Sequence, residues 1–238
     1  MISIIIPTLN EEKIIEKTLS FLASLPKNEF EIIVSDGGSK DKTVELAQKY
    51  ADQVVVLKNE HTIAAGRNFG AKQARGDFFV FLDADVFIYN AYEFFKKTLA
   101  EFEKNKKLVA LTVKLKILPE NETLADAFFH FLINFIHWFG CNILNLGNAS
   151  GEFQMIKKEA FFKVGGYNEK LVVAEDNDLF FRLSKIGKVK TVWSLTVYHT
   201  GRRIHQEGWF KILYLWLKNF FSVIFFKKSS SKKWEEVR

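Results

Sequence analysis

Two aspartates one residue apart, Asp83 and Asp85, directly follow the apolar run 78–82. A short unbroken run of aromatic and β-branched residues is typical of a strand buried on both faces of a parallel sheet. In open α/β sheets, ligands bind outside the carboxyl ends of such strands. Neighbouring carboxylates repel each other unless a positive charge lies beside them, and Mg²⁺ is usually held by one or two carboxylates together with phosphate oxygens. The pair therefore indicates a divalent cation that carries phosphate; a solvated turn containing two acids is the alternative.

Charged side chains also gather at two later points of the chain. Glu175 and Asp176 lie where a helix is predicted to begin, at residues 174–186. The helix dipole stabilises negative charge there, so a structural explanation covers either acid taken alone. His199, Arg202 and Arg203 come directly after the last predicted strand.

Composition narrows the class of protein. A chain of 238 residues with 48% hydrophobic residues can bury a full core as one large domain, or as one domain with an appendage. The net charge of +6 indicates an anionic partner: phosphate groups, an acidic membrane or nucleic acid. The basic residues are spread along the chain or lie in its tail, which disfavours nucleic acid. The single cysteine, Cys141, excludes an internal disulfide and a cysteine-based zinc site, and fits a reducing compartment.

The elements that must position these residues alternate between strand and helix. Strands are expected at 2–6, 30–35, 54–57, 77–82, 108–118, 152–156 and 190–198, and helices at 11–24, 41–50, 67–74, 91–103, 157–164 and 174–186. Such alternation predicts an α/β fold with a mostly parallel central sheet and helices on both faces. The N-terminus carries no charged segment of the signal-peptide type, and no run of about 20 uninterrupted apolar residues predicts a membrane-spanning helix.

Two further helices, near 124–146 and 209–226, are unusually hydrophobic. The polar residues of the first recur at steps of three or four: Asp126, His130, Asn134, His137, Cys141 and Asn145. They predict one narrow polar stripe on an otherwise apolar helix that either packs inside the protein or contacts lipid. His130 and His137 would lie about 10 Å apart along the helix, too far to share a metal ion, so we interpret them as polar-face residues.

The helix at 209–226 combines a large apolar face with aromatic residues and a basic tail. The tail carries Lys227, Lys228, Lys232 and Lys233. This combination suits a helix lying in the interface of an anionic membrane. Docking on the core and a dimer contact are the alternatives.

Taken in order, short motifs along the chain resemble those of the family 2 glycosyltransferases with the GT-A fold, among them the polyprenyl-phosphate sugar synthases. The motifs are Pro7-Thr8-Leu9-Asn10-Glu11-Glu12, Ser35-Asp36-Gly37-Gly38-Ser39, Gly66-Arg67-Asn68, Asp83-Ala84-Asp85, Gly165-Gly166-Tyr167, and Glu175-Asp176 with Asp178 and Arg182. Each motif is weak alone, but the ordered series is specific. The basic C-terminal helix lies outside the family's common pattern.

The resemblance implies that the chain binds a nucleotide-diphosphate sugar, such as a UDP- or GDP-sugar. The residues implied to hold base and ribose are Pro7, Thr8, Leu9, Glu11, Asp36 and Arg67. In the Asp83-Ala84-Asp85 motif, Asp83 would face the ribose or the metal and Asp85 would ligate Mn²⁺ or Mg²⁺.

The resemblance assigns the later residues to the reaction itself. His199 would supply a further metal ligand, unless it is a strand-end histidine bonded to backbone, and Arg202 or Arg203 would neutralise the β-phosphate. Asp176 would be the base of an inverting transfer and Glu175 would orient the acceptor or the helix terminus. If the acceptor is itself a phosphate, Asp176 only positions it.

The expected function is a metal-dependent inverting glycosyltransferase that acts on a lipid-linked or other hydroxyl or phosphate acceptor. Residues 1–118 would bind the nucleotide sugar, 119–203 would form the acceptor-binding and catalytic half of the same domain, and 204–238 would contact the inner face of the cell membrane from the cytoplasm. A soluble acceptor and a non-catalytic membrane-bound nucleotide-sugar-binding module are the alternatives. A sugar nucleotidylyltransferase is disfavoured, because its glycine-rich phosphate loop is replaced here by residues 7–10.

Overall fold

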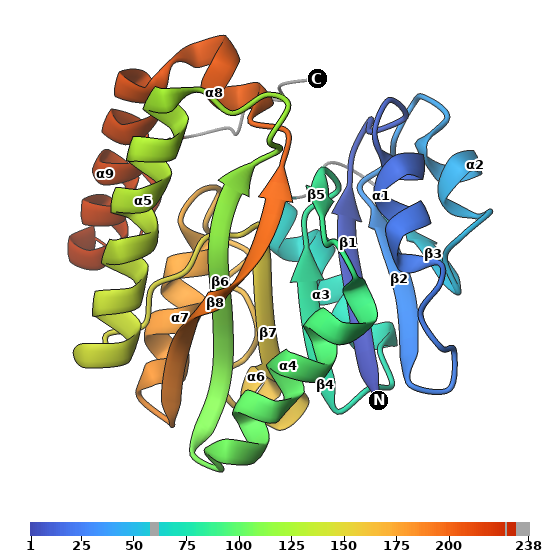
Figure 1. Cartoon of the computed structure of the whole chain (residues 1–238), viewed down its shortest axis with the longest axis horizontal. Helices are drawn as coiled ribbons and strands as arrows, with labels where there is room; N and C mark the ends of the chain where they lie inside the picture. Colours follow the sequence, from blue (N-terminus) through green and yellow to red (C-terminus); the bar gives the residue numbers. More distant parts are fainter. Residues whose placement is uncertain (58–61, 227, 232–238) are drawn as a thin grey trace.

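One eight-stranded sheet runs through the computed structural model, which describes residues 1–57, 62–226 and 228–231 (Figure 1). The strands are β1 (Ile2–Thr8), β2 (Phe30–Asp36), β3 (Gln53–Val56), β4 (Phe78–Leu82), β5 (Val86–Phe87), β6 (Leu108–Ile117), β7 (Phe153–Lys157) and β8 (Lys188–His199). Their order across the sheet is β3-β2-β1-β4-β7-β6-β8-β5. The sheet therefore takes strands from both the 1–118 part and the 119–203 part of the chain.

The sheet is mixed. The first four strands in its order, β3-β2-β1-β4, are parallel, as the alternation of strands and helices predicts. β7 then runs antiparallel to both β4 and β6, and the short β5 runs antiparallel to β8, whereas β6 and β8 are parallel. The expectation of a mostly parallel sheet is thus confirmed for β3-β2-β1-β4, and the rest of the sheet combines antiparallel and parallel pairs.

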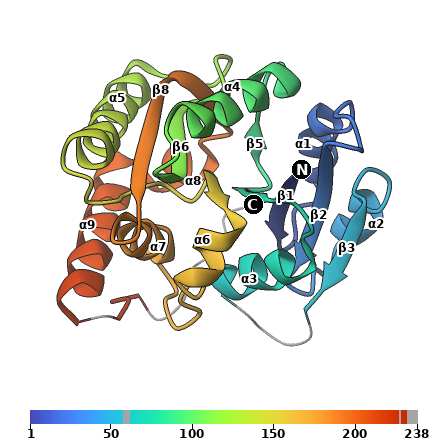
Figure 2. The same cartoon turned by 90° about the horizontal axis from the view of Figure 1, so that it is seen from below.

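Helices cover both faces of the sheet (Figure 2). They are α1 (Ile15–Leu22), α2 (Thr43–Ala47), α3 (Ile63–Gln73), α4 (Ala91–Lys104), α5 (Leu124–Trp138), the short π-helical segment η1 (Phe139–Ile143), α6 (Lys158–Lys163), α7 (Glu175–Ser184), α8 (Arg202–Glu207) and α9 (Trp209–Phe226). Because strand side chains alternate between faces, Ile4 and Ile6 of β1 join a buried cluster with α1 and α4, whereas Ile5 joins one with α3, α6 and α7.

Two predicted helices are shorter than expected, and hydrogen bonds in the preceding loops explain why. α1 begins at Ile15 rather than at residue 11, because Asn10 adopts a left-handed conformation (φ 53°) and the Glu11 amide donates to Thr43 Oγ1 at 2.7 Å. α2 begins at Thr43 rather than at 41, because the Asp41 side chain accepts from the Thr43 amide at 3.0 Å in a tight turn. Both loops lie at the edge of the sheet that carries the predicted site.

The polar stripe of α5 faces the protein, and its apolar side faces outward. Asp126, His130 and Asn134 are only 1–3% exposed, and the Asn134 side chain exchanges two 2.9 Å hydrogen bonds with the backbone of Leu115 in β6. The outward stripe comprises Leu124, Phe128, Phe131, Phe135, Ile136, Phe139 and Ile143, which are 43–93% exposed. The prediction of a narrow polar stripe on an otherwise apolar helix is therefore confirmed, and it is this stripe that packs inside the protein.

One helical segment of the described residues, Leu124–Ile143, has the length and composition of a membrane-spanning helix, with a mean hydropathy of 1.2 and 28% of it buried in the protein. The prediction that the chain has no run of about 20 uninterrupted apolar residues stands, although this segment reaches the length and mean hydropathy of a spanning helix. Counting uninterrupted apolar residues missed the segment because Asp126, His130 and Asn134 interrupt the run. A single such segment is weak evidence for a membrane span.

α9 lies beside α5 along one edge of the molecule (Figure 1). Trp209 stacks on Phe129 of α5 with ring centroids 4.8 Å apart, and both belong to a small apolar cluster around Ile117 and Ile204. The outward side of α9 carries Phe210, Tyr214, Leu217 and Phe221, which are 52–84% exposed. The helix thus docks on the core while a second apolar stripe remains outside; of the basic tail, Lys227, Lys232 and Lys233 lie outside the described residues.

Candidate active site

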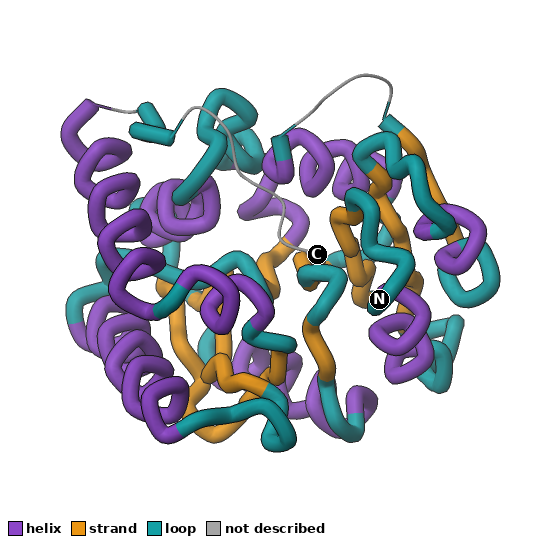
Figure 3. Tube along the Cα trace, turned by 90° about the horizontal axis from the view of Figure 1, so that it is seen from above, coloured by secondary structure: helices purple, strands orange, loops and turns teal. Residues whose placement is uncertain are grey.

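The carboxyl ends of β1, β2 and β4 share one edge of the sheet because these strands are parallel. β1 runs upward in Figure 1, and Figure 3 gives the view from above. Thr8 at the end of β1 is opposite Asp36 at the end of β2, and Asp83 follows the end of β4 at the same edge. The Asp83 amide donates to the Glu152 carbonyl at 3.3 Å, and the Ala84 carbonyl accepts from Thr18 Oγ1 at 2.6 Å. The predicted Asp83-Ala84-Asp85 turn is therefore held at the edge where α/β proteins bind ligands.

Arg67 joins this turn to the second acidic motif. Its guanidinium Nη2 donates to Asp83 Oδ1 and its Nη1 to Glu175 Oε1, each at 2.7 Å. Nη2 also donates to the Gly151 carbonyl at 3.1 Å, and the arginine is 1% exposed. Arg67 is predicted as a nucleotide contact; in this structure its guanidinium lies between two carboxylates that come from opposite halves of the chain.

Two glycines allow this arginine to reach its partners. A Cβ atom on Gly70 would lie 2.5 Å from Ile5 Cγ2, so only glycine lets α3 approach β1 this closely. A Cβ atom on Gly151 would lie 2.7 Å from Arg67 Nη2. Both close approaches require the absence of a side chain.

The site holds more negative than positive charge. Six carboxylates gather around two guanidinium groups, Arg67 and Arg202: they are those of Glu11, Asp83, Asp85, Glu152, Glu175 and Asp176. Burial raises the pKa of Asp83 to about 7, with the charges of Glu152 and Asp85 acting in the same direction and Arg67 opposing them. Burial, then the charge of Glu175, raises the pKa of Asp176 to about 7. Burial also raises the pKa of Glu152 and of Glu175.

This donor set fits a hard divalent cation. Carboxylate oxygens are the ligands that Mg²⁺ and Mn²⁺ prefer. A cation beside Asp83 and Asp85 would relieve the repulsion between them, which adds to the effect of burial on the pKa of Asp83. Among the residues that the structure describes, no three His, Cys, Asp or Glu side chains form a ready-made metal cluster. A site of one or two carboxylates completed by phosphate oxygens and water agrees with that finding.

Asp85 belongs to a second cluster, with residues from the first and last predicted motifs. Its Oδ2 accepts from Thr200 Oγ1 at 2.5 Å and lies 3.4 Å from Arg202 Nε. The Arg202 guanidinium also makes two 2.7 Å hydrogen bonds to the Glu11 carboxylate. A pocket of about 200 Å³, lined by Asn10, Glu11, Glu12, Lys13, Asp41 and Arg202, lies beside this pair. The structure thus brings together Glu11, Asp85 and Arg202.

Asp36 organises the turn after β2. Its Oδ2 accepts from Thr8 Oγ1 at 2.9 Å and from Ser39 Oγ at 2.6 Å, and its Oδ1 accepts from the amides of Gly38 and Ser39. The residue is fully buried. In this structure the carboxylate is therefore occupied in fixing the loop next to the predicted base-binding residues.

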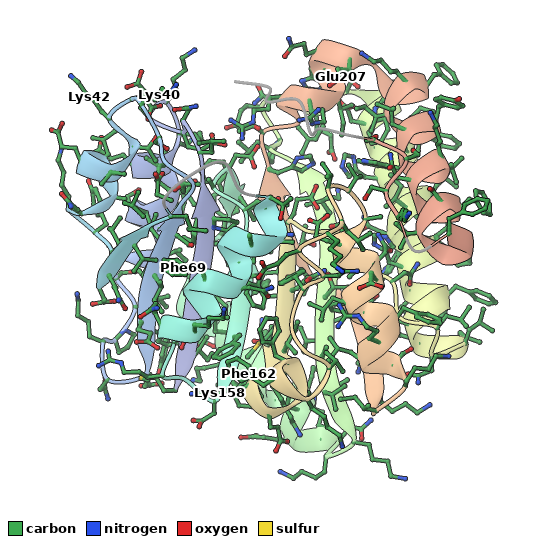
Figure 4. The ribbon with its side chains drawn as sticks, turned by 180° about the vertical axis from the view of Figure 1, so that it is seen from behind. Lys40, Lys42, Phe69, Lys158, Phe162 and Glu207 are labelled. Atoms are coloured by element: carbon green, nitrogen blue, oxygen red, sulfur yellow. The ribbon has the colours of Figure 1, made fainter. Side chains whose placement is uncertain are left out.

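Pro7, Leu9 and Arg203 complete the predicted set of binding residues. Pro7 pairs with Ser35 in the β1–β2 register, and the Leu9 side chain packs over Gly37. Arg203 donates to Glu207 at 2.9 Å within α8. Figure 4 labels Glu207 at the α8 end of the molecule.

The acidic pair opens α7 from a strained residue. Ala174 has a left-handed conformation (φ 65°), which is uncommon for a residue with a side chain. It turns the chain so that Glu175 reaches Arg67, while Asp176 Oδ1 accepts from the Asn177 amide at 2.7 Å. Asp176 therefore stands beside the Arg67 network without being paired to it by a direct hydrogen bond.

His199 meets a partner that sequence reasoning missed. Its Nε2 lies 3.1 Å from Nε2 of His130 in α5, and its Nδ1 accepts from the Gly201 amide at 3.3 Å. Burial lowers the pKa of each histidine to about 4. The interpretation of His130 as a polar-face residue holds, because the polar face is the buried one. Sequence reasoning also did not single out Glu152 and Thr200 as site residues. For Thr200, its position two residues before Arg202 was the one signal.

The chain belongs to glycosyltransferase family 2: the family model Glycosyl transferase family 2 matches residues 3–165. An uncharacterized glycosyltransferase of Haemophilus influenzae is 32% identical over 190 residues, which cover 77% of this chain and 62% of that protein. TarS of Staphylococcus aureus, a poly(ribitol-phosphate) β-N-acetylglucosaminyltransferase, is 38% identical over 93 residues, or 36% of this chain and 16% of TarS. The chain thus matches less than two thirds of either relative.

Solved structures share the GT-A fold of this chain. TarS residues 1–349 in complex with UDP-GlcNAc has a TM-score of 0.65 and 23% identity, covering 83% of this chain and 57% of that one. The mannosyltransferase PcManGT of Pyrobaculum calidifontis, in complex with GDP-Man and Mn²⁺, has a TM-score of 0.68 and 17% identity, covering 84% and 56%. The predicted family and fold class are therefore confirmed.

Proposed function

We propose that this chain transfers a sugar from a nucleotide-diphosphate sugar to a lipid-linked acceptor, in a metal-dependent, inverting reaction at the cytoplasmic face of the membrane. The observation that carries the proposal is the Arg67 bridge between Asp83 and Glu175. It joins the turn that would hold the diphosphate to the helix that would supply the base.

The donor would lie along the carboxyl ends of β1, β2 and β4. Glu11 beside the pocket would bind base or ribose donors, and Arg202 would turn toward the β-phosphate. In the structure Arg202 is bound to Glu11, so an incoming diphosphate competes with Glu11 for that guanidinium. The UDP-GlcNAc complex of TarS and the GDP-Man complex of PcManGT support a nucleotide sugar as donor.

Asp85 and Asp83 would hold a Mn²⁺ or Mg²⁺ ion. When bound, such an ion stabilises the charge that develops on the leaving diphosphate. The excess of carboxylates and the raised pKa of Asp83 support this assignment, as does the Mn²⁺ in the PcManGT structure.

Asp176 would act as the base on the acceptor hydroxyl. Its carboxylate takes the hydroxyl proton as the acceptor oxygen forms a bond to the anomeric carbon, and the bond from that carbon to the β-phosphate oxygen breaks. A pKa of about 7 suits this role, because a general base works best when its pKa lies near the working pH. Glu175, fixed by Arg67, would hold the start of α7 in place.

The outward apolar stripes of α5 and α9 support a membrane-bound acceptor. Side chains such as Phe128, Phe131, Phe210 and Phe221 are 52–84% exposed on neighbouring helices. Exposed lysines, Lys211, Lys218 and Lys228, accompany them on or just after α9. Apolar side chains that enter the headgroup region and lysines that attract anionic lipid are the features of an interfacial helix.

A binding panel and two variants test the proposal. We expect UDP-, GDP- or dTDP-sugars to raise the melting temperature, more so with Mn²⁺, because ligand binding stabilises the folded state. Asp85→Ala should abolish the Mn²⁺-dependent part of that rise. Asp176→Ala should keep donor binding and lose transfer to a polyprenyl-linked acceptor in vesicles. An active Asp176→Ala enzyme would overturn the assignment of Asp176 as the base. Transfer to soluble acceptors alone would overturn the lipid-linked acceptor.

A further inference from the structure

His130 and His199 come from distant parts of the chain and meet inside the protein. His130 lies on α5 and His199 ends β8; they are 2% and 7% exposed. Their Nε2 atoms lie 3.1 Å apart and their rings meet edge to face at 60°. At that separation one Nε2 must donate a proton and the other accept it, because two donors or two lone pairs would repel.

The neighbouring hydrogen bonds decide which nitrogen donates. His130 Nδ1 lies 2.9 Å from the backbone carbonyl of Asp126, which can only accept, so His130 carries its proton on Nδ1. Its Nε2 is then an acceptor, and His199 must donate from Nε2. The lone pair of His199 is consequently on Nδ1, where the Gly201 amide donates to it at 3.3 Å. Both ends of the chain of hydrogen bonds give the same assignment.

We infer that His130 is a positioning residue, which holds His199 in the tautomer whose Nδ1 lone pair faces the turn 199–202. This inference rests on the proposed function, because that turn also carries Thr200 and Arg202, the partners of Asp85. The Gly201 contact is long for a hydrogen bond and is readily exchanged for a stronger one. His199 Nδ1 is therefore prepared to act as a nitrogen ligand in the turn whose Thr200 binds the Asp85 carboxylate.

His130 can do this because its own orientation is fixed. Asp126, whose carbonyl binds His130, anchors the start of α5 through a reciprocal capping box with Thr123. The Asp126 carboxylate also accepts from Trp209 Nε1 at 2.7 Å and lies 2.9 Å from His205 Nε2. The Trp209 ring packs edge-on against the His130 ring, with centroids 5.0 Å apart. Residues that hold the second nitrogen of a ligating histidine in this way raise metal affinity in other sites.

Nitrogen NMR tests the tautomer without any metal or substrate. Spectra of the ¹⁵N-histidine-labelled chain, assigned with His130→Gln and His199→Gln, distinguish protonated from unprotonated ring nitrogens. We expect His199 to carry its proton on Nε2 and His130 on Nδ1. A proton on His199 Nδ1 would overturn the inference.

Substitutions at position 130 test the positioning role. Gln places a carbonyl oxygen where His130 Nε2 accepts, whereas Leu offers no acceptor. We expect His130→Leu to weaken Mn²⁺ binding in the presence of UDP or GDP by roughly 10–100-fold, and His130→Gln to stay within a few-fold of the wild type. Affinity for the nucleotide without metal should not change. Mn²⁺ binding is followed by electron paramagnetic resonance, and His137→Leu, two turns further along α5, is the matched control.

The outcomes separate this inference from the proposed function. Equal losses in the Gln and Leu variants would reduce His130 to a packing residue, as would no loss in either. If the wild type itself shows no effect of Mn²⁺ on nucleotide binding, the proposed metal dependence fails and the positioning role fails with it, while the NMR spectrum still decides the tautomer. Should the Leu variant not fold, a large loss in the Gln variant or a proton on His199 Nδ1 would still overturn the inference.

Discussion

Arg67 carries one charge and contacts two carboxylates, Asp83 and Glu175. A buried ion pair is a weak source of net stability, because both partners lose their hydration. Removal of one partner is different, since it leaves an uncompensated charge inside the protein. The network around Arg67 is therefore best understood as a device that fixes two acids relative to each other.

We expect Arg67→Met to lower the free energy of unfolding by about 3–5 kcal/mol, because Asp83 and Glu175 lose their common counter-charge. Lys27→Met is the matched control: Lys27 pairs with Asp52 but is 73% exposed, so the expected loss is below about 1 kcal/mol. Urea unfolding of both variants measures the difference. Equal losses would contradict the assignment of Arg67 as the central cation of the site.

Asp176 predicts the pH dependence of transfer. With a pKa of about 7, its carboxylate is mostly protonated at pH 6 and mostly ionised at pH 8. The proposed base is active when ionised, so kcat/KM should fall nearly tenfold for each pH unit below 7 and level off above it. Because burial raises the pKa of Asp176, the protonated side chain stabilises the folded state at acid pH. This contribution to the free energy of unfolding is lost as the pH rises through 7. Asp176→Asn should therefore raise the melting temperature at pH 8 more than at pH 5. A kcat/KM that does not change between pH 6 and 8 would contradict the role of Asp176 as the base.

For individual site residues, the sequence predicts well which of them lie close together. It predicts less well which atoms they bind. The Asp83, Asp85, Glu175 and Arg202 positions follow from motif order, and the structure gathers them at one edge of the sheet. The burial of Arg67 between two acids is not visible from its motif, because it depends on the packing of α3 against β1. The His130–His199 contact depends on the path of the chain between α5 and β8, which local patterns do not encode.

The loop before β7 is fitted to α7 through a glycine. Gly147 has a left-handed conformation (φ 69°), and a Cβ atom there would lie 2.1 Å from the Phe180 carbonyl oxygen. Gly165 has a similar φ of 80°, but a Cβ atom there would meet no atom within 4 Å. A side chain at either position would strain the backbone to a similar degree. Only at Gly147 would it also clash with a neighbouring residue.

We expect Gly165→Ala to cost about 1 kcal/mol, the strain of a left-handed alanine. Gly147→Ala should cost several-fold more, because α7 must also move away from the loop. Thermal unfolding measures both. If α7 shifts, Glu175 leaves Arg67, so Gly147→Ala should also weaken donor binding; equal effects of the two variants would argue against the fit between loop and helix.

The elements themselves are largely those that hydrophobic periodicity predicts. Strands 2–6 and 77–82 were located because their apolar runs are buried on both faces. The starts of α1 and α2 were placed too early, because side-chain hydrogen bonds across two loops, Glu11 to Thr43 and Thr43 to Asp41, replace the first helical turn. The direction of β7 was not predicted, since pairing between strands that are far apart in sequence leaves no local signal.

α5 and α9 lie next to each other at one side of the molecule (Figure 2), and both carry exposed apolar side chains there. We expect replacement of Phe128, Phe131 and Phe135 together by Ser to lower binding to vesicles that contain anionic lipid. Each phenylalanine is 46–58% exposed, and insertion of such a surface contributes about 1 kcal/mol, so the triple variant should bind on the order of a hundredfold less.

Vesicle co-sedimentation at low and high salt measures this loss. Phe162→Ser is the control, because Phe162 is 46% exposed and lies on α6, away from α5 and α9 (Figure 4). Binding that is equally weak in wild type and triple variant would contradict the membrane contact. Unchanged melting temperatures are expected, because all three side chains point away from the core.

The place of β7 has a consequence for how the chain is made. Synthesis proceeds from the N-terminus, so β4 and β6 leave the ribosome before the strand that pairs with both of them. Until residues 153–157 emerge, two hydrophobic strands carry bare edges that invite association between nascent chains. We therefore expect fragments that stop short of β7 to precipitate.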